Sequence, residues 1–496
     1  MNTPVNKPVV WTIAGSDSSG GAGIQADLRV FEYFGLHGAS VTTALTAQNS
    51  KQIHAIHFSS PEFINAQLAV LQEELPAKAV KIGLLGQSDT IQNLKAFLKA
   101  YTGYAVLDPV LFSTSGKKLC QQEEKKYAQQ LTQLLPYVNV ATPNILEAEI
   151  ILGMSIKTHT EMEKAAHAFL ALGCKNVIIK GGHLYHDTMC QDYWTNGSQS
   201  YWLANNRYQN RNYRGTGCTF SSAMTGALAL GYEIRDAIVI AKMYVNRGIR
   251  LSSAFNSNSA FIHHAGWPED EIDLPVLSNQ AFGKTLPTFP DCGMKSLGLY
   301  PVVDSSEWVQ TLLSLGVKTI QLRIKNKSRQ VLESEIQKSI QYAKKFEARL
   351  FINDYWELAI AHGAYGVHLG QEDLETANIN RIREAGLRLG ISTHCYYEVA
   401  RAHTFKPSYL ACGPIFPTTS KIMPFTPQGL TNLQRWHKTL SSYSLVAIGG
   451  INTTNIQPVL ATKVSGVAMI SAITQSDDPI QQTKTLLQYV ENDQCH

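Results

Sequence analysis

Short apolar runs alternate with helical stretches along almost the whole chain, and this alternation limits the fold more than any other feature. In the first half the alternation predicts a largely parallel β-sheet with helices on both faces. The strand-like runs are Val9–Ser16, Ser40–Ala47, Ala79–Leu85, Ala105–Leu111, Val138–Pro143 and Val177–Gly181. The helical runs are Ile24–Phe34, Ser60–Glu74, Thr90–Leu98, Glu123–Leu135, Asn144–Leu152 and Glu161–Leu172, with two long helices near 218–231 and 235–253. The turn Thr195-Asn196-Gly197-Ser198 adds a β-hairpin.

The second half has eight strand-like runs within about 200 residues, with helical stretches between most of them. Eight such units are typical of a (β/α)8 TIM barrel, and the alternative is an open sheet with one strand misassigned. The runs are Leu297–Val303, Thr319–Ile324, Arg349–Asn353, Gly366–Leu369, Leu389–Thr393, Tyr409–Phe416, Leu445–Gly449 and Gly466–Ser471.

A chain of 496 residues is too long for one ordinary core and fits two domains. Periodicity fails from about 272 to 293, where Pro, Gly and Asn recur, so this segment is expected to be a linker, and a tether rather than a rigid hinge. The expected organisation is an α/β domain over 1–272, a linker over 273–293 and a barrel over 294–496.

Composition excludes several classes of protein. A net charge of +4 without a Lys/Arg run argues against a nucleic-acid partner. No apolar run approaches the roughly 20 residues that span a bilayer, so no membrane partner is expected. The eight cysteines contain no C-x-x-C pair, which favours free thiols in a reducing, cytoplasmic setting. The oligomeric state is not readable from the sequence, and a homo-oligomer stays open.

The stretch Arg214–Ser222 carries the strongest chemical signal of the first half. Gly215 and Gly217 allow a tight turn and close approach to a ligand, and the helix that follows would offer its free N–H groups to an anion. Cys218 lies at the start of that helix, a position that lowers a thiol's pKa and suits a base or nucleophile. The alternative is a tight turn capped by Thr219 with a buried cysteine.

Other polar groups follow the predicted strands at the edge where ligands gather in such sheets. The glycine-rich run Ala14–Asp27 follows the first strand, but it lacks a P-loop lysine and G-x-G-x-x-G spacing. The remaining groups share a position just after a strand. They are Gln48, Asp108, Asn144, Glu147 and Lys180. Carboxylates opposite a phosphate loop suit Mg²⁺, although each of these residues taken singly also fits a helix cap or a solvated position.

In these motifs, the first half strongly resembles the hydroxymethylpyrimidine/phosphomethylpyrimidine kinases of thiamine synthesis, which have a ribokinase-like fold. The resemblance spans about 1–260 and rests on motifs in the family's order. They are Ala14–Asp27, Thr46–Asn49, Lys81–Gly83, Asp108–Val110, Thr142–Glu147, Lys180–His183 and Gly215–Thr219. The resemblance implies that Asp27 and Gln48 bind the aminopyrimidine. It also implies that ATP and Mg²⁺ are bound by Asp108, Asn144, Glu147 and Lys180. Gly215 and Gly217 would form the anion hole, and Cys218 would be the base. Leu84 stands where the family usually has Met, the usual Met is lost after Asp108-Pro109-Val110, and Arg214 stands where His is common. Arg214 could alter how the pyrophosphate is held.

In the second half, we read only the residues at the carboxyl ends of the barrel strands, where active sites of this fold lie. Arg323 and Lys325 form a basic pair, and Asp354 and Asp373 follow two adjacent strands. Two carboxylates can share Mg²⁺ with a diphosphate that the basic pair neutralises. The loops after strands seven and eight are a common phosphate site of the fold, so one rim is expected to hold both a metal-diphosphate site and a monophosphate site.

This half closely resembles thiamine-phosphate synthase over nearly all its length. The motifs are Gln321–Lys325, Asn353-Asp354, Gly366–Asp373, Gly413–Thr418 with Lys421, Ala447–Ile451 and Ile470-Ser471. The resemblance implies that Asp354 and Asp373 bind Mg²⁺, that Gln321, Arg323, Lys325, Asn353, Ser392 and Lys421 bind the pyrimidine diphosphate, and that Thr418, Thr419, Ser420, Gly450, Ile470 and Ser471 bind the thiazole phosphate. Ile324 replaces a common Glu, and Ser420 replaces a common Thr.

The two resemblances together imply a bifunctional enzyme whose substrates are small molecules: a pyrimidine, thiazole phosphate and ATP. The first half would make the pyrimidine diphosphate and the second would join it to the thiazole phosphate. Two alternatives stay open: a pyridoxal-type kinase in the first half, and a ligand-binding sensor in either half.

Overall fold

The structure is a computed structural model that describes residues 7–49, 52–112, 119–120, 123–182, 184, 188–208, 212–256, 259–283, 286–293, 296–418 and 426–494. The chain divides into two compact units. The first contains residues 1–268 and 272–284, and the second contains residues 269–271 and 285–496.

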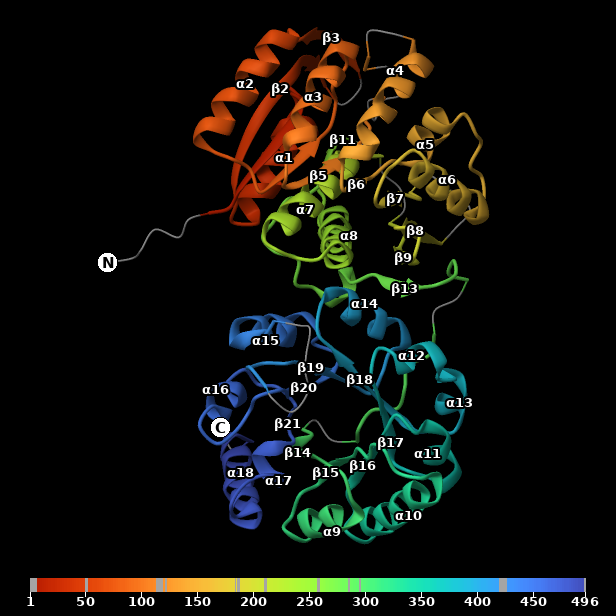
Figure 1. The fold of residues 1–496 in the computed structure, drawn as a ribbon, viewed down its shortest axis with the longest axis vertical. Coiled ribbons are helices and arrows are strands. Elements are labelled where there is room, and N and C mark those ends of the chain that lie inside the picture. The colour runs from red at the N-terminus through yellow and green to blue at the C-terminus, as the bar shows by residue number, and fades with distance from the viewer. Residues whose placement is uncertain are drawn as a thin grey trace, which may run out of the picture. The chain divides into compact units, whose positions relative to one another are not determined.

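The first unit is built on a ten-stranded mixed sheet in the order β13-β9-β8-β7-β6-β5-β4-β1-β2-β3 (Figure 1). The six strands from β7 to β2 in that order are parallel, which confirms the predicted parallel core. These strands are β1 (Val9–Gly15), β2 (His37–Gln48), β4 (Ala79–Ile82), β5 (Tyr104–Leu107), β6 (Val140–Ala141) and β7 (Val177–Ile179). The antiparallel strands are β3 (Ile53–Phe58), β8 (Met189–Thr195), β9 (Ser200–Asn206) and β13 (Val276–Ser278). The hairpin β8–β9 is the one predicted from the Asn-Gly turn.

Helices cover both faces of this sheet. One face packs against α2 (Pro61–Glu74), α3 (Ser88–Ala100), α4 (Glu124–Leu131), the 3-10 helix η1 (Thr132–Tyr137), α5 (Ile145–Leu152) and α6 (His159–Ala171). The other face packs against α1 (Gly23–Tyr33), α7 (Thr216–Ala229) and, through α7, α8 (Ile234–Arg250). A small separate sheet, β10 (Asn212–Arg214), β12 (Ser259–Phe261) and β11 (Ala254–Asn256), was not predicted, and a second 3-10 helix is η2 (Glu271–Asp273).

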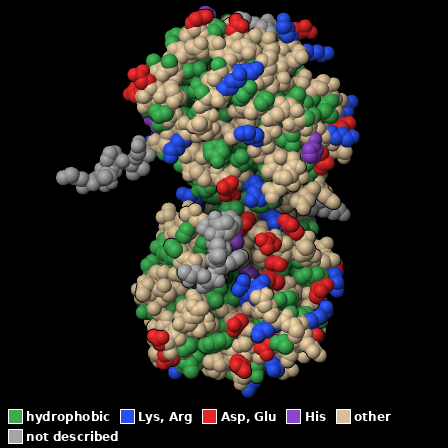
Figure 2. Space-filling model, viewed as in Figure 1, with side chains coloured by type: hydrophobic (Ala, Val, Ile, Leu, Met, Phe, Trp, Pro, Cys, Tyr) green, Lys and Arg blue, Asp and Glu red, His purple; other side chains and the backbone are tan. Residues whose placement is uncertain are grey.

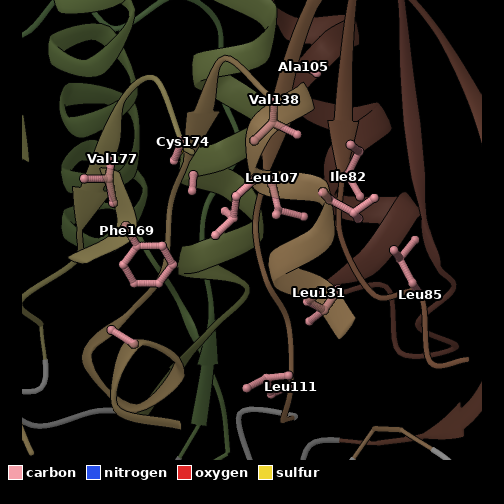
Figure 3. Packing of buried hydrophobic residues seen from close by; sticks show 14 of the residues in the cluster. Ile82, Leu85, Ala105, Leu107, Leu111, Leu131, Val138, Phe169, Cys174 and Val177 are labelled. Carbon is pink, nitrogen blue, oxygen red and sulfur yellow. The ribbon is translucent and has the colours of Figure 1, made fainter. Parts of the chain in front are cut away.

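The core of the first unit fills the space between the sheet and its helices. Figure 3 shows Ile82 of β4, Leu107 of β5 and Val177 of β7 meeting Leu131 of α4 and Phe169 of α6. Each of these side chains is at most 2% exposed. Burying a side chain of this size contributes about 1.5–3 kcal/mol, so the core fixes the strand ends that carry the polar groups.

The second unit is a closed barrel of eight parallel strands, as the sequence predicts (Figure 1). The strands are β14 (Gly298–Val303), β15 (Thr319–Leu322), β16 (Arg349–Asn353), β17 (Gly366–Leu369), β18 (Arg388–Thr393), β19 (Tyr409–Cys412), β20 (Ser444–Ile448) and β21 (Gly466–Met469). The helices are α9 (Ser306–Ser314), α10 (Arg329–Lys345), α11 (Trp356–His362), α12 (Asp373–Thr376), α13 (Ile379–Glu384), α14 (Tyr396–Phe405), α15 (Gly429–Thr439), α16 (Ile456–Leu460), α17 (Ser471–Thr474) and α18 (Pro479–Gln494).

Parts of the expected linker are built into the units, which corrects its interpretation as a free tether. Val276–Ser278 pairs with β9, so a strand extends the first sheet there. Phe289 and Cys292 are 3% and 2% exposed, and Cys292 packs into a core cluster of the barrel with Tyr300 and Phe351. Burying the apolar side chains at these positions is more favourable than leaving them in water, so the segment packs onto the units. The boundaries 1–272, 273–293 and 294–496 stay a prediction.

The surface charges and the cysteines add little to the functional assignment. On the face in view in Figure 2, basic and acidic side chains are interspersed. The seven cysteines within the described ranges are all free thiols. In the described part of the chain, no helix is both long and apolar enough to cross a membrane.

Candidate active sites

The first site is a cavity of about 520 Å³ at the carboxyl edge of the parallel strands. Eight of the nine predicted kinase residues line it: Gln48, Asp108, Asn144, Glu147, Lys180, Gly215, Gly217 and Cys218. They come from the ends of β2, β5, β6 and β7 and from the first turn of α7. The sheet therefore gathers residues that lie up to 170 positions apart in the sequence.

The helix α7 starts earlier than predicted. It begins at Thr216, with Gly215 as its N-cap at φ +79°, so Gly217 and Cys218 belong to its first turn rather than to the preceding loop. A Cβ at Gly215 would come within 2.0 Å of the Gly21 carbonyl, so no larger residue fits there. The Thr219 N–H already bonds to the Gly215 carbonyl, and the N–H groups before it are the ones that a helix start leaves for an anion.

Asp108 and Lys180 form the charged centre of the cavity. The Lys180 Nζ lies 2.8 Å from Asp108 Oδ1, and both side chains are largely buried. Burial alone would raise the pKa of Asp108, but Lys180 and Lys81 outweigh it and hold that pKa below its usual range. Asp108 is therefore a carboxylate at neutral pH and can offer oxygen to a cation.

Asn144 and Glu147 have two roles at once. They form a capping box on α5: the Glu147 N–H donates to Asn144 Oδ1 at 2.9 Å, and the Asn144 N–H donates to Glu147 Oε2 at 2.8 Å. Burial raises the pKa of Glu147 to about 7, with Lys180 opposing the shift and Asp108 adding to it. The simple interpretation as a helix cap was correct, and the same cap places both side chains on the cavity wall.

Cys218 differs from its prediction. Burial raises the pKa of its thiol to about 11, although Lys81 opposes the shift. The expectation that the helix start lowers this pKa is therefore wrong, because desolvation of the thiolate is the larger effect. At neutral pH the residue is a thiol.

Asp27 does not line the cavity. It is fully buried, and its carboxylate accepts from Thr12 Oγ1 at 2.6 Å, Ser222 Oγ at 2.6 Å and Lys81 Nζ at 2.9 Å. Burial opposes the charge on Lys81, but Asp27, Cys218 and Asp108 together outweigh it and raise the pKa of Lys81. The placement of Asp27 thus does not support direct contact with a pyrimidine: the residue holds Lys81, which does line the cavity.

A second unpredicted residue organises the glycine-rich loop. Asp17 is 1% exposed and accepts from the N–H groups of Ser19, Gly21 and Ala22 and from the Ser19 hydroxyl. Ser18 in turn donates to the Gln48 carbonyl at 2.9 Å and accepts from the Gln48 N–H at 2.9 Å. The loop therefore fixes the end of β2, where Gln48 faces the cavity.

The second site lies at the carboxyl ends of the barrel strands. Asp354 follows β16 with φ +64°, a backbone conformation that is strained for a non-glycine residue, and its Oδ2 lies 2.5 Å from Lys325 Nζ. Asp373 is close enough to bond to Asp354; burial first, and then Asp354, raises its pKa. Two carboxylates this close together are a donor set that a cation would stabilise.

No group of three or more His, Cys, Asp or Glu side chains in the described ranges could hold a metal ion. Mg²⁺ commonly binds through one or two carboxylates together with substrate phosphates. Asp354 with Asp373 on the barrel, and Asp108 with Glu147 in the first unit, fit that mode of binding.

A buried hydrogen-bond chain crosses the barrel interior beneath this rim. Gln321 Nε2 lies 3.4 Å from the Tyr300 hydroxyl, which lies 2.7 Å from the Tyr409 hydroxyl. Tyr409 reaches His368 Nδ1 at 2.7 Å, and His368 Nε2 reaches Ser392 Oγ at 2.8 Å. Burial lowers the pKa of His368 to about 4, so a neutral ring joins these partners. The chain was not predicted, and it connects two predicted pyrimidine residues, Gln321 and Ser392.

The structure describes most of the remaining predicted residues of the barrel rim. Asn353 is the last residue of β16, and Arg323 follows β15. Ile324, which stands where the resembling family commonly has Glu, is 3% exposed. Ile470 is the N-cap of the short helix α17, and Ser471 is its first residue. Gly450, at φ +68°, follows β20, the strand that pairs with β21 before α17. Thr418 is described, whereas Thr419, Ser420 and Lys421 lie outside the described residues.

The fold defines a ribokinase-like kinase unit followed by a (β/α)8 barrel. A family model described as phosphomethylpyrimidine kinase matches residues 17–263, and one described as thiamine monophosphate synthase matches residues 299–473. The chain belongs to the thiamine-phosphate synthase family through its barrel and carries a phosphomethylpyrimidine kinase domain before it.

Individual relatives agree with this assignment. The thiamine-phosphate synthase of Yersinia pseudotuberculosis serotype O:1b is 55% identical over 205 residues, which is 41% of this chain and 95% of that protein. The thiamine-phosphate synthase of Photorhabdus laumondii is 56% identical over 195 residues, 39% of this chain and 90% of that protein. The pyridoxal kinase of Staphylococcus aureus in complex with AMP-PCP is similar in structure, with a TM-score of 0.50, 28% identity, and coverage of 55% of this chain and 98% of that one.

Proposed function

We propose that the chain is a bifunctional enzyme of thiamine biosynthesis. The first unit phosphorylates 4-amino-5-hydroxymethyl-2-methylpyrimidine, and then its monophosphate, with ATP. The second unit condenses the diphosphate with thiazole phosphate to give thiamine phosphate and pyrophosphate. The observation that carries the proposal is that one chain contains both a cavity with the Lys180–Asp108 pair and a barrel rim with the Lys325–Asp354 pair.

In the kinase unit, the residues act mainly by positioning and charge. Lys180 neutralises phosphate charge, and the first turn of α7 stabilises the transferred phosphoryl group through its N–H groups. Gln48 can bond to both a donor and an acceptor on the pyrimidine ring. Mg²⁺ would be held by Asp108 and Glu147 and would offset the negative charge of the ATP phosphates.

The two kinase steps differ in their need for a base. The alcohol must lose a proton, whereas a phosphate monoester, with a second pKa of about 6, is already largely dianionic at neutral pH. Cys218 can take the alcohol's proton only when its thiol is ionised, and a pKa of about 11 keeps the ionised fraction small at pH 7. A role for Cys218 as base therefore concerns the first step alone.

In the barrel, Arg323, Lys325 and Lys421 would stabilise the departing pyrophosphate, and Asn353, the last residue of β16, would bind the same diphosphate. Mg²⁺ would be held by Asp354 and Asp373 and would balance the charge of the diphosphate. The electron-rich aminopyrimidine supports a cationic methylene, which the thiazole nitrogen captures. Ser392, Gln321 and the buried chain between them fix the pyrimidine, while Gly450, Ile470 and Ser471 offer phosphate contacts.

Step-resolved assays of the full-length chain test this proposal. Asp354→Asn is expected to abolish pyrophosphate release from the diphosphate and thiazole phosphate and to leave ATP-dependent phosphorylation intact. Lys180→Met is expected to do the reverse. Glu357→Gln and Lys175→Met, exposed positions on α11 and before β7, are the matched controls. Loss of both activities in either site variant would contradict the assignment of one reaction to each unit.

A pyridoxal-type kinase is the second candidate for the first unit, because the similarity to the S. aureus pyridoxal kinase covers 98% of that chain. Competition between pyridoxal and the hydroxymethylpyrimidine for the wild-type chain separates the two. A larger kcat/KM for pyridoxal would favour the second candidate.

A further inference from the structure

Arg214 is a buried cation on the cavity wall that the kinase mechanism above does not use. It is the last residue of β10, it directly precedes the N-cap of α7, and it is only 4% exposed. Its Nη1 donates to the Asn49 carbonyl, while its Nε is buried without a hydrogen-bond partner. The unpaired Nε lies on the same edge of the guanidinium as Nη2, and an arginine uses this edge to bind two oxygens of one phosphate.

The other cavity-lining cations are already paired. Lys180 pairs with Asp108 and Lys81 pairs with Asp27, whereas Arg214 forms no salt bridge with any carboxylate among the residues that the structure describes. A buried charge without a counter-charge is unfavourable, and an anionic ligand would offset that cost. Arg214 therefore points to an anion that the protein itself does not provide.

The position of Arg214 indicates which anion this is. Through Asn49 it is fixed to the end of β2, beside Gln48. In the sheet, β2 is separated by β1, β4 and β5 from β6 and β7, after which Asn144 and Lys180 lie. The first turn of α7 lies between the two ends of the cavity, since Gly217 lies near Lys180 and Gly215 lies against Gly21. Arg214 is thus at the end of the cavity opposite Lys180, where the acceptor rather than the nucleotide would bind.

We propose that Arg214 binds the phosphate of the monophosphate acceptor and so favours the second phosphorylation over the first. This inference rests on the proposed kinase function. In that step an oxygen of the acceptor's phosphate attacks the γ-phosphorus of ATP and forms the new P–O–P bridge. The bond from the γ-phosphorus to the β,γ-bridging oxygen breaks, and ADP leaves with the electron pair. The alcohol acceptor of the first step is neutral and gives Arg214 no charge to bind.

The test compares the two acceptors on the full-length chain. For Arg214→Gln, we expect kcat/KM for the monophosphate to fall about 10- to 100-fold more than kcat/KM for the alcohol, the size of a lost charge-assisted contact. Arg214→Lys keeps the charge without the paired donors and should fall between Arg214→Gln and the wild type. Lys99→Gln removes an exposed lysine near the end of α3 that does not line the cavity, and it should leave the ratio of the two kcat/KM values unchanged.

The outcomes separate the possible roles. An equal loss for both acceptors would overturn the inference, because it would mean that Arg214 contacts the transferred phosphoryl group or acts only by holding Asn49. A larger loss for the alcohol would also overturn it. If Arg214→Gln does not fold, the affinity for the pyrimidine monophosphate is measured without ATP for Arg214→Lys and for the wild type. Equal affinities would refute the contact between Arg214 and the phosphate. Absence of phosphorylation of either acceptor by the wild type would instead refute the kinase function itself.

Discussion

Removing Lys81 tests whether Asp27 is a structural residue or a substrate-binding one. Lys81 and Asp27 are both 0% exposed, with Nζ and Oδ2 2.9 Å apart, and the other contacts of Asp27 are hydroxyls of the protein itself. Lys81→Met leaves the carboxylate buried without its counter-charge, which costs about 3–5 kcal/mol. For a unit of this size, that loss corresponds to a fall in Tm of roughly 6–20 °C.

Thermal unfolding of the full-length chain measures this effect, and the synthase activity of the same sample reports whether the barrel stays folded. The double variant Asp27→Asn/Lys81→Met removes both charges and should recover at least half of the lost stability, because replacing both members of a buried pair is often close to neutral. Lys78→Met, an exposed lysine just before β4, is the matched control and should change stability by less than about 0.5 kcal/mol.

Two results would refute this account of Asp27. One is a Lys81→Met variant whose kinase unit unfolds at the wild-type temperature. The other is an Asp27→Asn variant that keeps its Tm but has a KM for the pyrimidine raised tenfold or more, which would restore Asp27 as a pyrimidine ligand.

Three further predictions concern proton transfer, pH and the buried chain. The rate of phosphorylation of the alcohol should rise with pH because the thiol of Cys218, with a pKa raised to about 11, must ionise before it can act as a base. Cys218→Ala should remove that rise, and a wild-type rate that does not change with pH would exclude the base role. Burial lowers the pKa of His403 and of His368 to about 4, so the unfolded barrel binds more protons than the folded one between pH 4 and 6.5. The free energy of unfolding of the barrel should therefore fall as the pH drops through that range, by about 1.4 kcal/mol per pH unit for each histidine. His403→Gln should reduce this slope by about half in thermal unfolding, and an unchanged slope would contradict the argument. Tyr409→Phe should destabilise the barrel by about 1–3 kcal/mol and raise the KM for the pyrimidine diphosphate while the kinase rates stay the same; an unchanged synthase KM would show that the chain does not position Ser392.

The sequence predicts the fold well where hydrophobic periodicity and strand-end position carry the signal. The eight barrel strands and the six parallel strands of the first sheet follow from apolar runs whose burial drives folding. The polar residues after those strands meet because the carboxyl ends of parallel strands share one edge of a sheet. The cavity residues Gln48, Asp108 and Lys180 were predicted for this reason.

The sequence is less informative where tertiary contacts decide. Asp27 has the same residue type and motif position as a ligand-binding carboxylate, and only the packing of α1 against the sheet and α7 reveals that its partners are Lys81 and Ser222. A usable signal was present: Lys81 interrupts the apolar run Ala79–Leu85, and a charge inside a buried strand needs a buried partner. The raised pKa of Cys218 depends on the depth of burial, which local position does not report. The edge strand β13 is three residues long and pairs with a distant β9, so no local period could show it.

Formation of thiamine phosphate from the hydroxymethylpyrimidine, thiazole phosphate and ATP with Mg²⁺, by the purified full-length chain, tests the central claim most directly. We expect product only when ATP is present, accumulation of the pyrimidine diphosphate with Asp354→Asn, no product with Lys180→Met, and recovery of product when the two variants are mixed. A wild-type chain that forms no thiamine phosphate with ATP and Mg²⁺ present would contradict the account.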